Sequence, residues 1–332
     1  MANVEGHCDP RFDQLKATLE EQLSSGNELG AAIAINIDGM NVVDIWGGYT
    51  DEARTQPWTR DTITNVWSST KTVASLAALI QISRGKLDPN APVAKYWPEF
   101  AQNGKDKVLI RHILSHTSGV SGWEGPITWE EVYGPSSIER LAEQAPWWEP
   151  GTASGYHSNN MGHLIGEVIR RTSGKSMKQF VAEEIAGPLG ADFQIGAQEK
   201  DWPRIAPILP PPPLPIDFSK MDPNSVAVKT FGNPPPDATQ AGRRDRSGRW
   251  YTLDLGVGFG LTEGAITQTA PWLPKGRVCF WAGWGGSVII MDLDRKVTFS
   301  YVMQRMGSGI VGSERTEAYL RAAYKALGVD GY

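Results

Sequence analysis

Cysteine is scarce in this chain, since only Cys8 and Cys279 occur among its 332 residues. Two cysteines build neither a disulfide framework nor a thiolate metal cluster. Long apolar runs are also lacking: the longest, residues 73–82, is interrupted by Ser75 and Gln81 and is too short to span a bilayer. The N-terminal stretch "MANVEGHCDPRFDQ" has no apolar core of the kind that a signal peptide carries. We therefore expect a soluble cytoplasmic protein with no membrane partner.

Positive charge is not in excess either. The chain has 32 lysines and arginines against 37 aspartates and glutamates, a formal net charge of −5. A slightly acidic chain has no electrostatic reason to bind nucleic acid or an anionic membrane surface. We expect no nucleic-acid partner, and the sequence leaves the oligomeric state open.

Three common catalytic or cofactor motifs are missing. No serine stands in a Gly-x-Ser-x-Gly pattern, which excludes the nucleophile elbow of α/β-hydrolases. His112 and His116 are four residues apart, but Ile113 occupies the place of the catalytic glutamate of a zinc helix, so we expect structural histidines. The stretch "GVGFG" has a misplaced third glycine and no helix after it, which favours a strand edge over a dinucleotide site.

Helix and strand patterns are present at both ends of the chain. Apolar residues at helical spacing predict a helix over residues 10–24. Two β-rich runs then meet at Asp38-Gly39, a strong hairpin signal, and an apolar helix follows and ends near Gly85. Near the C-terminus the pattern predicts strands and a final helix, over residues 255–264, 276–283, 286–294, 296–306 and 314–327.

The middle of the chain reads differently, as helical pieces broken by proline and glycine. Strands at both ends without βαβ alternation indicate an antiparallel sheet built from both termini. We therefore predict an α+β fold (an α/β sandwich), in which helices flank this sheet and a mainly helical lobe is inserted. Residues 1–86 and 251–332 would form a discontinuous sheet domain, and residues 87–250 the helical lobe.

Proline is concentrated in one segment of that lobe, residues 201–250. Eleven of the 23 prolines lie between Pro203 and Pro236, and a structureless loop of this length is uncommon in a compact domain. The segment is either a shortened surface loop or a stiff wall beside a functional site. Docking of a polyproline-binding module is a third interpretation.

Two Ser-x-x-Lys patterns occur in the apolar helix. Ser68 stands where the helix begins, and Lys71, three residues later, lies on the same helix face. The N-terminus of a helix has unpaired backbone N–H groups and favours an alkoxide or oxyanion. Ser83 and Lys86 instead flank Gly85 at the far end, where lysine commonly caps exposed carbonyls, so we interpret this second pair as structural.

For Ser68 a plain structural role is the alternative, as an N-cap with Lys71 in solvent. The helix beyond Lys71 is apolar nearly all round, which predicts that it is buried. A buried lysine loses part of its basicity through desolvation and becomes a plausible general base. The local pattern alone leaves both interpretations open.

Several stretches resemble the serine β-lactamase and penicillin-binding-protein superfamily, most closely its family VIII carboxylesterases and their transacylase relatives. They include "VDIWGGYTDEARTQPWTRDT", "NVWSSTKTVASL", "LDPNAPVAKYWPEF", "ILSHTSGV", "WEPGTASGYH" and "GGSVIIMDLDRKVTFSYVMQRM". The resemblance runs from about Leu29 to Leu327 and is missing in the proline-rich segment. It implies a sheet domain and a helical lobe with the active site between them.

By this resemblance Ser68 is the nucleophile and Lys71 its partner. The second family motif, Tyr-x-Asn, matches Tyr156-His157-Ser158, so Tyr156 would be the second base or acid, close to both. Ser158 stands where the family has asparagine, although Asn159 follows directly. We therefore include His157, Ser158 and Asn159 as candidates for substrate contact. Without the resemblance Tyr156 is one of nine tyrosines.

The third family motif, Lys-Thr-Gly in lactamases and often His- or Trp-x-Gly in esterases, fits two registers. Trp281-Ala282-Gly283 is preferred, because "GGS" then starts the next strand; the oxyanion-hole N–H groups would be those of Ser68 and Trp284. The alternative, starting at Trp284, would use Ser287. Both tryptophans could instead simply pack at a strand end.

No lysine stands in either register of the third motif, and a cation there binds the carboxylate of β-lactams. The resemblance therefore implies an esterase that forms an acyl-enzyme on Ser68 and needs no metal or organic cofactor. Its partner would be a small-molecule ester or acyl donor. Two alternatives are a biosynthetic enzyme, such as an acyltransferase, that uses the same site, and a binding protein of this fold without turnover.

Overall fold

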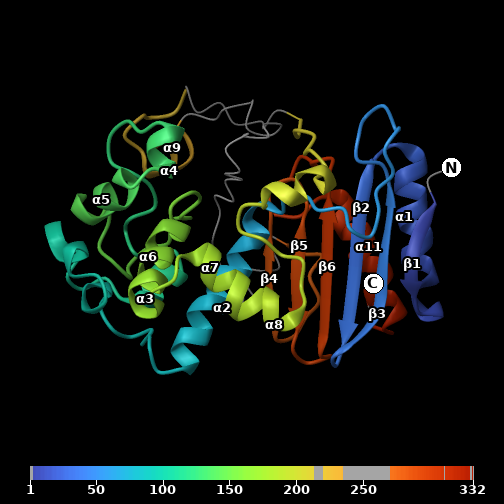
Figure 1. The fold of residues 1–332 in the computed structure, drawn as a ribbon, viewed down its shortest axis with the longest axis horizontal. Helices are drawn as coiled ribbons and strands as arrows, with labels where there is room; N and C mark the ends of the chain where they lie inside the picture. Colours follow the sequence, from blue (N-terminus) through green and yellow to red (C-terminus); the bar gives the residue numbers. More distant parts are fainter. Residues whose placement is uncertain (1–2, 213–219, 235–269, 310, 330, 332) are drawn as a thin grey trace.

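The structure is a computed structural model of the chain and describes residues 3–212, 220–234, 270–309, 311–329 and 331. A sheet with its helices makes up one half of the molecule, and a group of short helices makes up the other half (Figure 1). The predicted fold class is confirmed, since an antiparallel sheet is built from both ends of the chain and the helical part is inserted between them.

Six strands form one sheet in the order β1-β3-β2-β6-β5-β4, and every neighbouring pair is antiparallel. Their bounds are β1 Val4–Cys8, β2 Gly30–Ile37, β3 Met40–Gly48, β4 Val278–Ala282, β5 Val288–Asp292 and β6 Val297–Met303. The pairing of β2 with β6 joins the N-terminal strands to the C-terminal ones in the middle of the sheet. Three predicted C-terminal strands are thereby confirmed, and the fourth, 255–264, lies outside the described residues.

The predicted hairpin at Asp38-Gly39 joins β2 to β3 and is confirmed. Asp38 has φ 48° and Gly39 has φ 90°, so both turn residues are left-handed. Two left-handed residues characterise the tight turns whose twist matches that of paired strands, and Asp-Gly tolerates them well. The turn therefore sets the register of β2 against β3.

Two long helices pack against each other and share a core with the sheet, and both were predicted from the sequence. Helix α1 spans Asp13–Ser25 after a short 3₁₀ turn at Pro10–Phe12, and helix α11 spans Glu314–Ala326. Their buried side chains share one core with the inward residues of the strands. Alternate residues of β6 are buried, as expected for a sheet face against a helical layer.

The helical half of the molecule has its own core (Figure 1). The other α-helices of the molecule are α2 Thr70–Ser83, α3 Ile110–Leu114, α4 Trp129–Tyr133, α5 Ser136–Glu143, α6 Met161–Ser173, α7 Met177–Val181, α8 Gly187–Leu189, which lies over the sheet in Figure 1, and α9 Val226–Phe231. Shorter helical turns are Trp67–Ser69, Val93–Lys95, Pro98–Gly104 and Glu199–Arg204, with a π-helical turn at Ala182–Ala186. Helix α2 packs against α6 and α7, and Ala74, Ala77 and Ala78 lie in this second core.

The predicted domain boundary at residue 86 stays a prediction, with α2 contributing its buried alanines to the core of the helical half. The described part of the proline-rich segment contacts both halves. Ile205 bridges to Ile63 and Leu209 to Arg305, close to the sheet, whereas α9 lies in the helical half. Among the described residues, none of the helices combines the length and the apolar character needed to cross a membrane.

Candidate active site

A tight turn presents Ser68 at the start of α2. Trp67 has φ 47°, a left-handed conformation that a bulky residue seldom adopts, and its N–H donates to the Asn65 side chain over 2.8 Å. The turn Trp67–Ser69 runs straight into α2, so the predicted helix start at this serine is confirmed. Ser68 is 7% exposed. A strained residue directly before Ser68 restricts the backbone of the turn that carries this serine.

Lys71 and Tyr156 both contact the hydroxyl of Ser68. The Oγ of Ser68 lies 2.8 Å from the Tyr156 hydroxyl and accepts a hydrogen bond from Lys71 Nζ over 3.1 Å. Lys71 is fully buried, donates to the Ser158 carbonyl over 3.0 Å, and has its Nζ 4.8 Å from the Tyr156 ring centroid. The predicted proximity of the three side chains is confirmed. A hydroxyl held between an amine and a phenol can pass its proton to either group.

The backbone around Tyr156 is held by a second segment, which contains His116. The N–H of Gly155 donates to the His116 carbonyl over 2.9 Å, and the N–H of His157 donates to His116 Nδ1 over 3.1 Å. The His116 ring also meets the Tyr156 ring edge-on, with centroids 4.9 Å apart. His116, for which the sequence predicted a structural role and not a zinc site, therefore positions the loop that carries Tyr156.

His157 points into the protein interior. It is fully buried, with Nδ1 2.6 Å from the Gly155 carbonyl and Nε2 2.5 Å from the Ser118 hydroxyl. Burial lowers the pKa of His157 to about 4, and burial together with the neighbouring His157 lowers the pKa of His116 well below 6.5. Both rings are therefore neutral at pH 7. In this geometry His157 supports the loop, which differs from the substrate contact expected from the motif.

Ser158 and Asn159 lie beside the three reactive groups, but their described contacts are local. Ser158 contributes its main-chain carbonyl, which holds Lys71 in place. Its hydroxyl lies 3.4 Å from the Asn159 side-chain oxygen. The next residue, Asn160, is buried and donates to the Val120 carbonyl over 2.9 Å. The loop thus fixes Lys71 through its backbone.

The end of β4 closely approaches the turn Trp67–Ser69 at Gly283. A Cβ atom on Gly283 would come within 2.3 Å of the Val66 carbonyl oxygen, so only glycine fits. The Ser287 hydroxyl donates to the same carbonyl over 2.8 Å and lies 3.1 Å from the Ser69 hydroxyl. These contacts fix the strand end against the turn that carries Ser68.

Tryptophan rings surround this junction. Trp281 packs beside Tyr156, with centroids 5.7 Å apart, and stacks on His116 at 5.9 Å. Trp284 meets Trp67 edge-on at 5.4 Å. Trp281 therefore packs against the loop that carries Tyr156, and Trp284 packs against the turn that carries Ser68.

Phe231, at the end of α9, is a neighbour of the site that the sequence gave no reason to select. Its ring stacks beside that of Tyr156, with centroids 6.3 Å apart and an interplanar angle of 28°. It is 38% exposed. No motif marks this position, because the family resemblance is missing in the proline-rich segment.

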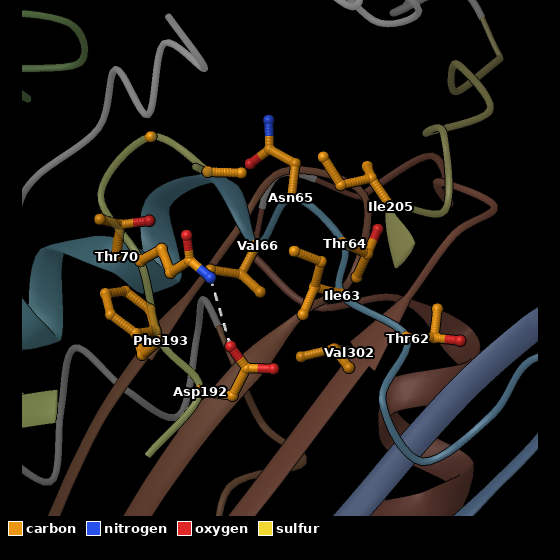
Figure 2. Close-up of a pocket in the computed structure, with 13 residues that line it drawn as sticks. Thr62, Ile63, Thr64, Asn65, Val66, Thr70, Asp192, Phe193, Ile205 and Val302 are labelled. Atoms are coloured by element: carbon orange, nitrogen blue, oxygen red, sulfur yellow. Dashed lines mark hydrogen bonds between the residues drawn. The ribbon is translucent and has the colours of Figure 1, made fainter. Parts of the chain in front are cut away.

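A cavity of about 240 Å³ lies next to the turn Trp67–Ser69, with Val66 and Thr70 in its lining (Figure 2). Its lining is mostly apolar and comes from residues 62–66, Thr70, residues 192–194, Gly196, Ala197, Ile205 and Val302. Ser68, Lys71 and Tyr156 do not line it, so the cavity is separate from the three reactive groups. The Thr70 hydroxyl is buried and has no hydrogen-bond partner among the described residues.

Metal ligands do not gather around these groups. Within the part of the chain that the structure describes, no three histidine, cysteine, aspartate or glutamate side chains are placed to hold a metal ion. The chemistry available from the described side chains is that of a hydroxyl nucleophile with an amine and a phenol beside it.

Comparison with known proteins points to one family. Residues 15–324 match the protein family described as Beta-lactamase. The esterase/beta-lactamase LipL of Mycobacterium tuberculosis is 35% identical over 210 residues, which are 63% of this chain and 49% of LipL. Esterase EstB of Burkholderia gladioli is 29% identical over 195 residues, covering 53% of this chain and 49% of EstB. The chain spans about half the length of these curated relatives.

A solved structure extends the similarity over nearly the whole chain. The crystal structure of a family VIII carboxylesterase superposes with a TM-score of 0.85 and 29% sequence identity. The match covers 98% of this chain and 100% of that one. The arrangement of sheet and helical half is therefore shared with a carboxylesterase of known structure.

Proposed function

Because this chain belongs to the Beta-lactamase family, we propose that it is a serine hydrolase that cleaves carboxylic esters through an acyl-enzyme on Ser68. One observation supports this most: the Ser68 Oγ lies 2.8 Å from the Tyr156 hydroxyl and 3.1 Å from Lys71 Nζ. A serine hydroxyl becomes a useful nucleophile when an adjacent base takes its proton. Both candidates for that base are already within hydrogen-bond distance.

In the proposed acylation, Ser68 attacks the ester carbonyl while Lys71 and Tyr156 take its proton. Groups this close titrate together, so the base is the pair and not one member. The oxyanion would rest on the backbone N–H groups of Ser68 and Trp284, each worth about 3 kcal/mol in comparable sites. The close approach of Gly283 to Val66, which brings the strand end against the nucleophile turn, supports this register of the third motif.

Acylation is completed when Tyr156 protonates the leaving alkoxide, and in the second half of the reaction water attacks the acyl-enzyme with the same pair as base. An alcohol in place of water would make the reaction an acyl transfer. Trp281 stands where lactamases place a lysine, so we expect esters to be preferred to β-lactams. No metal or organic cofactor takes part in this scheme, and the cytoplasmic location stays a prediction.

Labelling with a fluorophosphonate probe tests the proposal. The probe should modify the peptide that contains Ser68, and Ser68→Ala should abolish both labelling and turnover of p-nitrophenyl esters. Ser83→Ala, at the far end of the same helix, is the matched control and should keep both. The wild type should also turn over nitrocefin with a lower kcat/KM than a short-chain ester.

Two results would contradict the proposal. Full activity in Ser68→Ala with loss in Ser83→Ala would move the nucleophile to the other Ser-x-x-Lys pair. Complete absence of labelling and of ester turnover in the folded wild type would instead favour a binding protein of this fold.

A further inference from the structure

Helix α9 places one aromatic side chain beside the proposed general acid. Phe231 is the last residue of this helix, and its ring stacks next to that of Tyr156, 6.3 Å between centroids and 28° between planes. With 38% of its surface exposed, Phe231 is one of the few large apolar side chains of the described residues that lie at the surface. An exposed aromatic ring next to a reactive group is suited to contact a substrate.

Several contacts fix α9 to the helical half, so the position of Phe231 is defined. The hydroxyl of Thr230, which is buried, lies 2.8 Å from that of Ser121. The Asn233 side chain donates to the Trp123 and Gly125 carbonyls over 3.0 and 2.8 Å. It also accepts from the Ile127 N–H over 3.2 Å.

Lys229, a charged residue of α9, also helps to hold this helix against the helical half. Lys229 forms an ion pair with Glu124 at 3.0 Å and lies over the Trp147 ring, 5.2 Å from its centroid. Because Glu124 neutralises this cation, the end of α9 presents an aromatic ring next to Tyr156 and not an unpaired charge. An uncharged partner suits this end of the helix.

The chemistry of the proposed reaction decides which part of a substrate reaches Phe231. When the tetrahedral intermediate collapses, the bond between the carbonyl carbon and the ester oxygen breaks, and that oxygen takes a proton from Tyr156. The leaving oxygen must therefore be within reach of the Tyr156 hydroxyl. A carbon chain on that oxygen that extends along the Tyr156 ring meets Phe231.

We propose that Phe231 and the ring of Tyr156 form a subsite for the alcohol part of the ester, selective for uncharged alkyl or aryl alcohols. This inference rests on the proposed ester hydrolysis and adds the substrate class. By microscopic reversibility the same subsite holds an alcohol that acts as acyl acceptor. Its O–H proton passes to the Lys71–Tyr156 pair as its oxygen bonds the acyl carbon, and the bond to Ser68 Oγ breaks while Oγ takes the proton back.

Two ester series separate the alcohol subsite from the rest of the site. One series keeps the acyl group as acetyl and changes the alcohol from methyl to hexyl and phenyl; the other keeps methanol and lengthens the acyl group. Phe231→Ala should lower kcat/KM for hexyl and phenyl acetate by about tenfold, the loss of contact to roughly two methylene groups. It should change the methyl acetate value less than about twofold, and the response across the acyl series should match the wild type.

Partitioning gives a second readout. The acyl-enzyme formed from acetyl esters has already lost its alcohol, so Phe231→Ala should lower its hydrolysis rate far less than it lowers transfer to an alcohol. The fraction of acetyl group transferred to added 1-hexanol should fall about tenfold, and Phe231→Leu should retain most of it. Val226→Ala, at the exposed first position of the same helix, is the matched control and should behave as the wild type.

Three outcomes would overturn the subsite. They are an equal loss on methyl and hexyl acetate, a loss that follows the acyl series, and unchanged transfer to 1-hexanol in Phe231→Ala. Each of these leaves acylation of Ser68 intact and so leaves the proposed function standing. Absence of any acyl-enzyme in the wild type would defeat the proposed function and the subsite together.

Discussion

At the scale of single residues, the site depends on one hydroxyl shared by two partners. Ser68 and Tyr156 are 88 positions apart in the chain, whereas Ser68 and Lys71 are one helical turn apart. The Lys71 amine also donates to the Ser158 carbonyl, and so the Tyr156 loop positions both partners. The two groups are therefore coupled through space and through the loop backbone.

We predict that Lys71 and Tyr156 act as a unit. Lys71→Ala and Tyr156→Phe should each cost several kcal/mol of transition-state free energy, measured as kcat/KM for a p-nitrophenyl ester, and the double variant should lose little more. Residues that share one proton-transfer step are not additive, because the first substitution already removes the step. Penalties that simply sum would show two independent roles.

Thr70 offers a residue-scale test of an unpaired hydroxyl. Thr70 and Thr72 are both in the first turn of α2, but only the Thr72 hydroxyl has a described acceptor, the Ser69 carbonyl at 2.6 Å. Thr70→Val should leave the free energy of unfolding unchanged or raise it by up to about 1 kcal/mol, whereas Thr72→Val should lower it by about 1 kcal/mol. Urea unfolding measures both. A Thr70→Val variant whose free energy of unfolding falls as much as that of Thr72→Val would show that the Thr70 hydroxyl does have a partner.

At the scale of elements, two loops hold each other beside the nucleophile. The segment that contains His116 and Ser118 contacts Gly155 and His157 of the Tyr156 loop through three hydrogen bonds. Both histidines are buried and neutral, so this support depends on their staying unprotonated. Acid should therefore loosen the loop.

The pH dependence of stability tests this support. His157 has a pKa of about 4 in the folded protein, lowered mainly by burial from 6.5, so the unfolded chain binds a proton more readily. Neutral His157 therefore contributes on the order of 3 kcal/mol to the free energy of unfolding above pH 6.5, and this contribution is lost as the pH falls toward 4. His157→Gln should make the free energy of unfolding fall less steeply between pH 6.5 and 4, with urea titrations at each pH as the measurement. His7→Gln, at an exposed position of β1, is the control and should show the pH dependence of the wild type. A wild-type pH dependence in His157→Gln would contradict the proposed role of His157.

At the scale of the whole molecule, a buried ion pair joins the two ends of the chain. Glu28 precedes β2, and Arg315 in α11 donates to its carboxylate over 2.5 Å. Tyr301 of β6 donates to the other oxygen over 2.5 Å, and Tyr319 of α11 lies 3.4 Å away. Burial raises the pKa of Glu28 to about 7 in spite of Arg315. The ionised form of Glu28 is therefore less favoured in the folded protein than in water, even with Arg315 beside it.

Removing one partner of this pair should be costly, and a second arginine on the same helix provides the control. Arg315→Met should lower the free energy of unfolding by about 3 kcal/mol at pH 7, because it leaves a buried carboxylate without its cation. The difference from the wild type should shrink as the pH falls to 5, because Glu28 then takes up a proton. Arg321→Met, which breaks the exposed pair with Glu317, should change stability by less than about 1 kcal/mol. Equal effects of the two substitutions in urea unfolding would show that the buried pair has no special role.

Local features of the chain were determined by the sequence itself. The Asp38-Gly39 hairpin, the helices α1 and α11 and the strands β4 to β6 follow from turn chemistry and apolar spacing, which depend on neighbouring residues alone. The placing of Ser68 and Lys71 on one face at a helix start is of the same kind. The link to Tyr156 came from the family resemblance, since spacing alone gives no reason to choose one tyrosine among nine.

Contacts between distant segments were decided only by the tertiary structure. Gly283 reads as one more glycine until the Val66 carbonyl occupies the space of its missing side chain, and His157 reads as a site residue until its ring is buried against Ser118. Phe231 lies beside Tyr156 because Asn233 and its neighbours dock α9 on the helical half. Each of these depends on how segments far apart in the chain pack together, and packing sums many weak contacts for which the chain has no local signal.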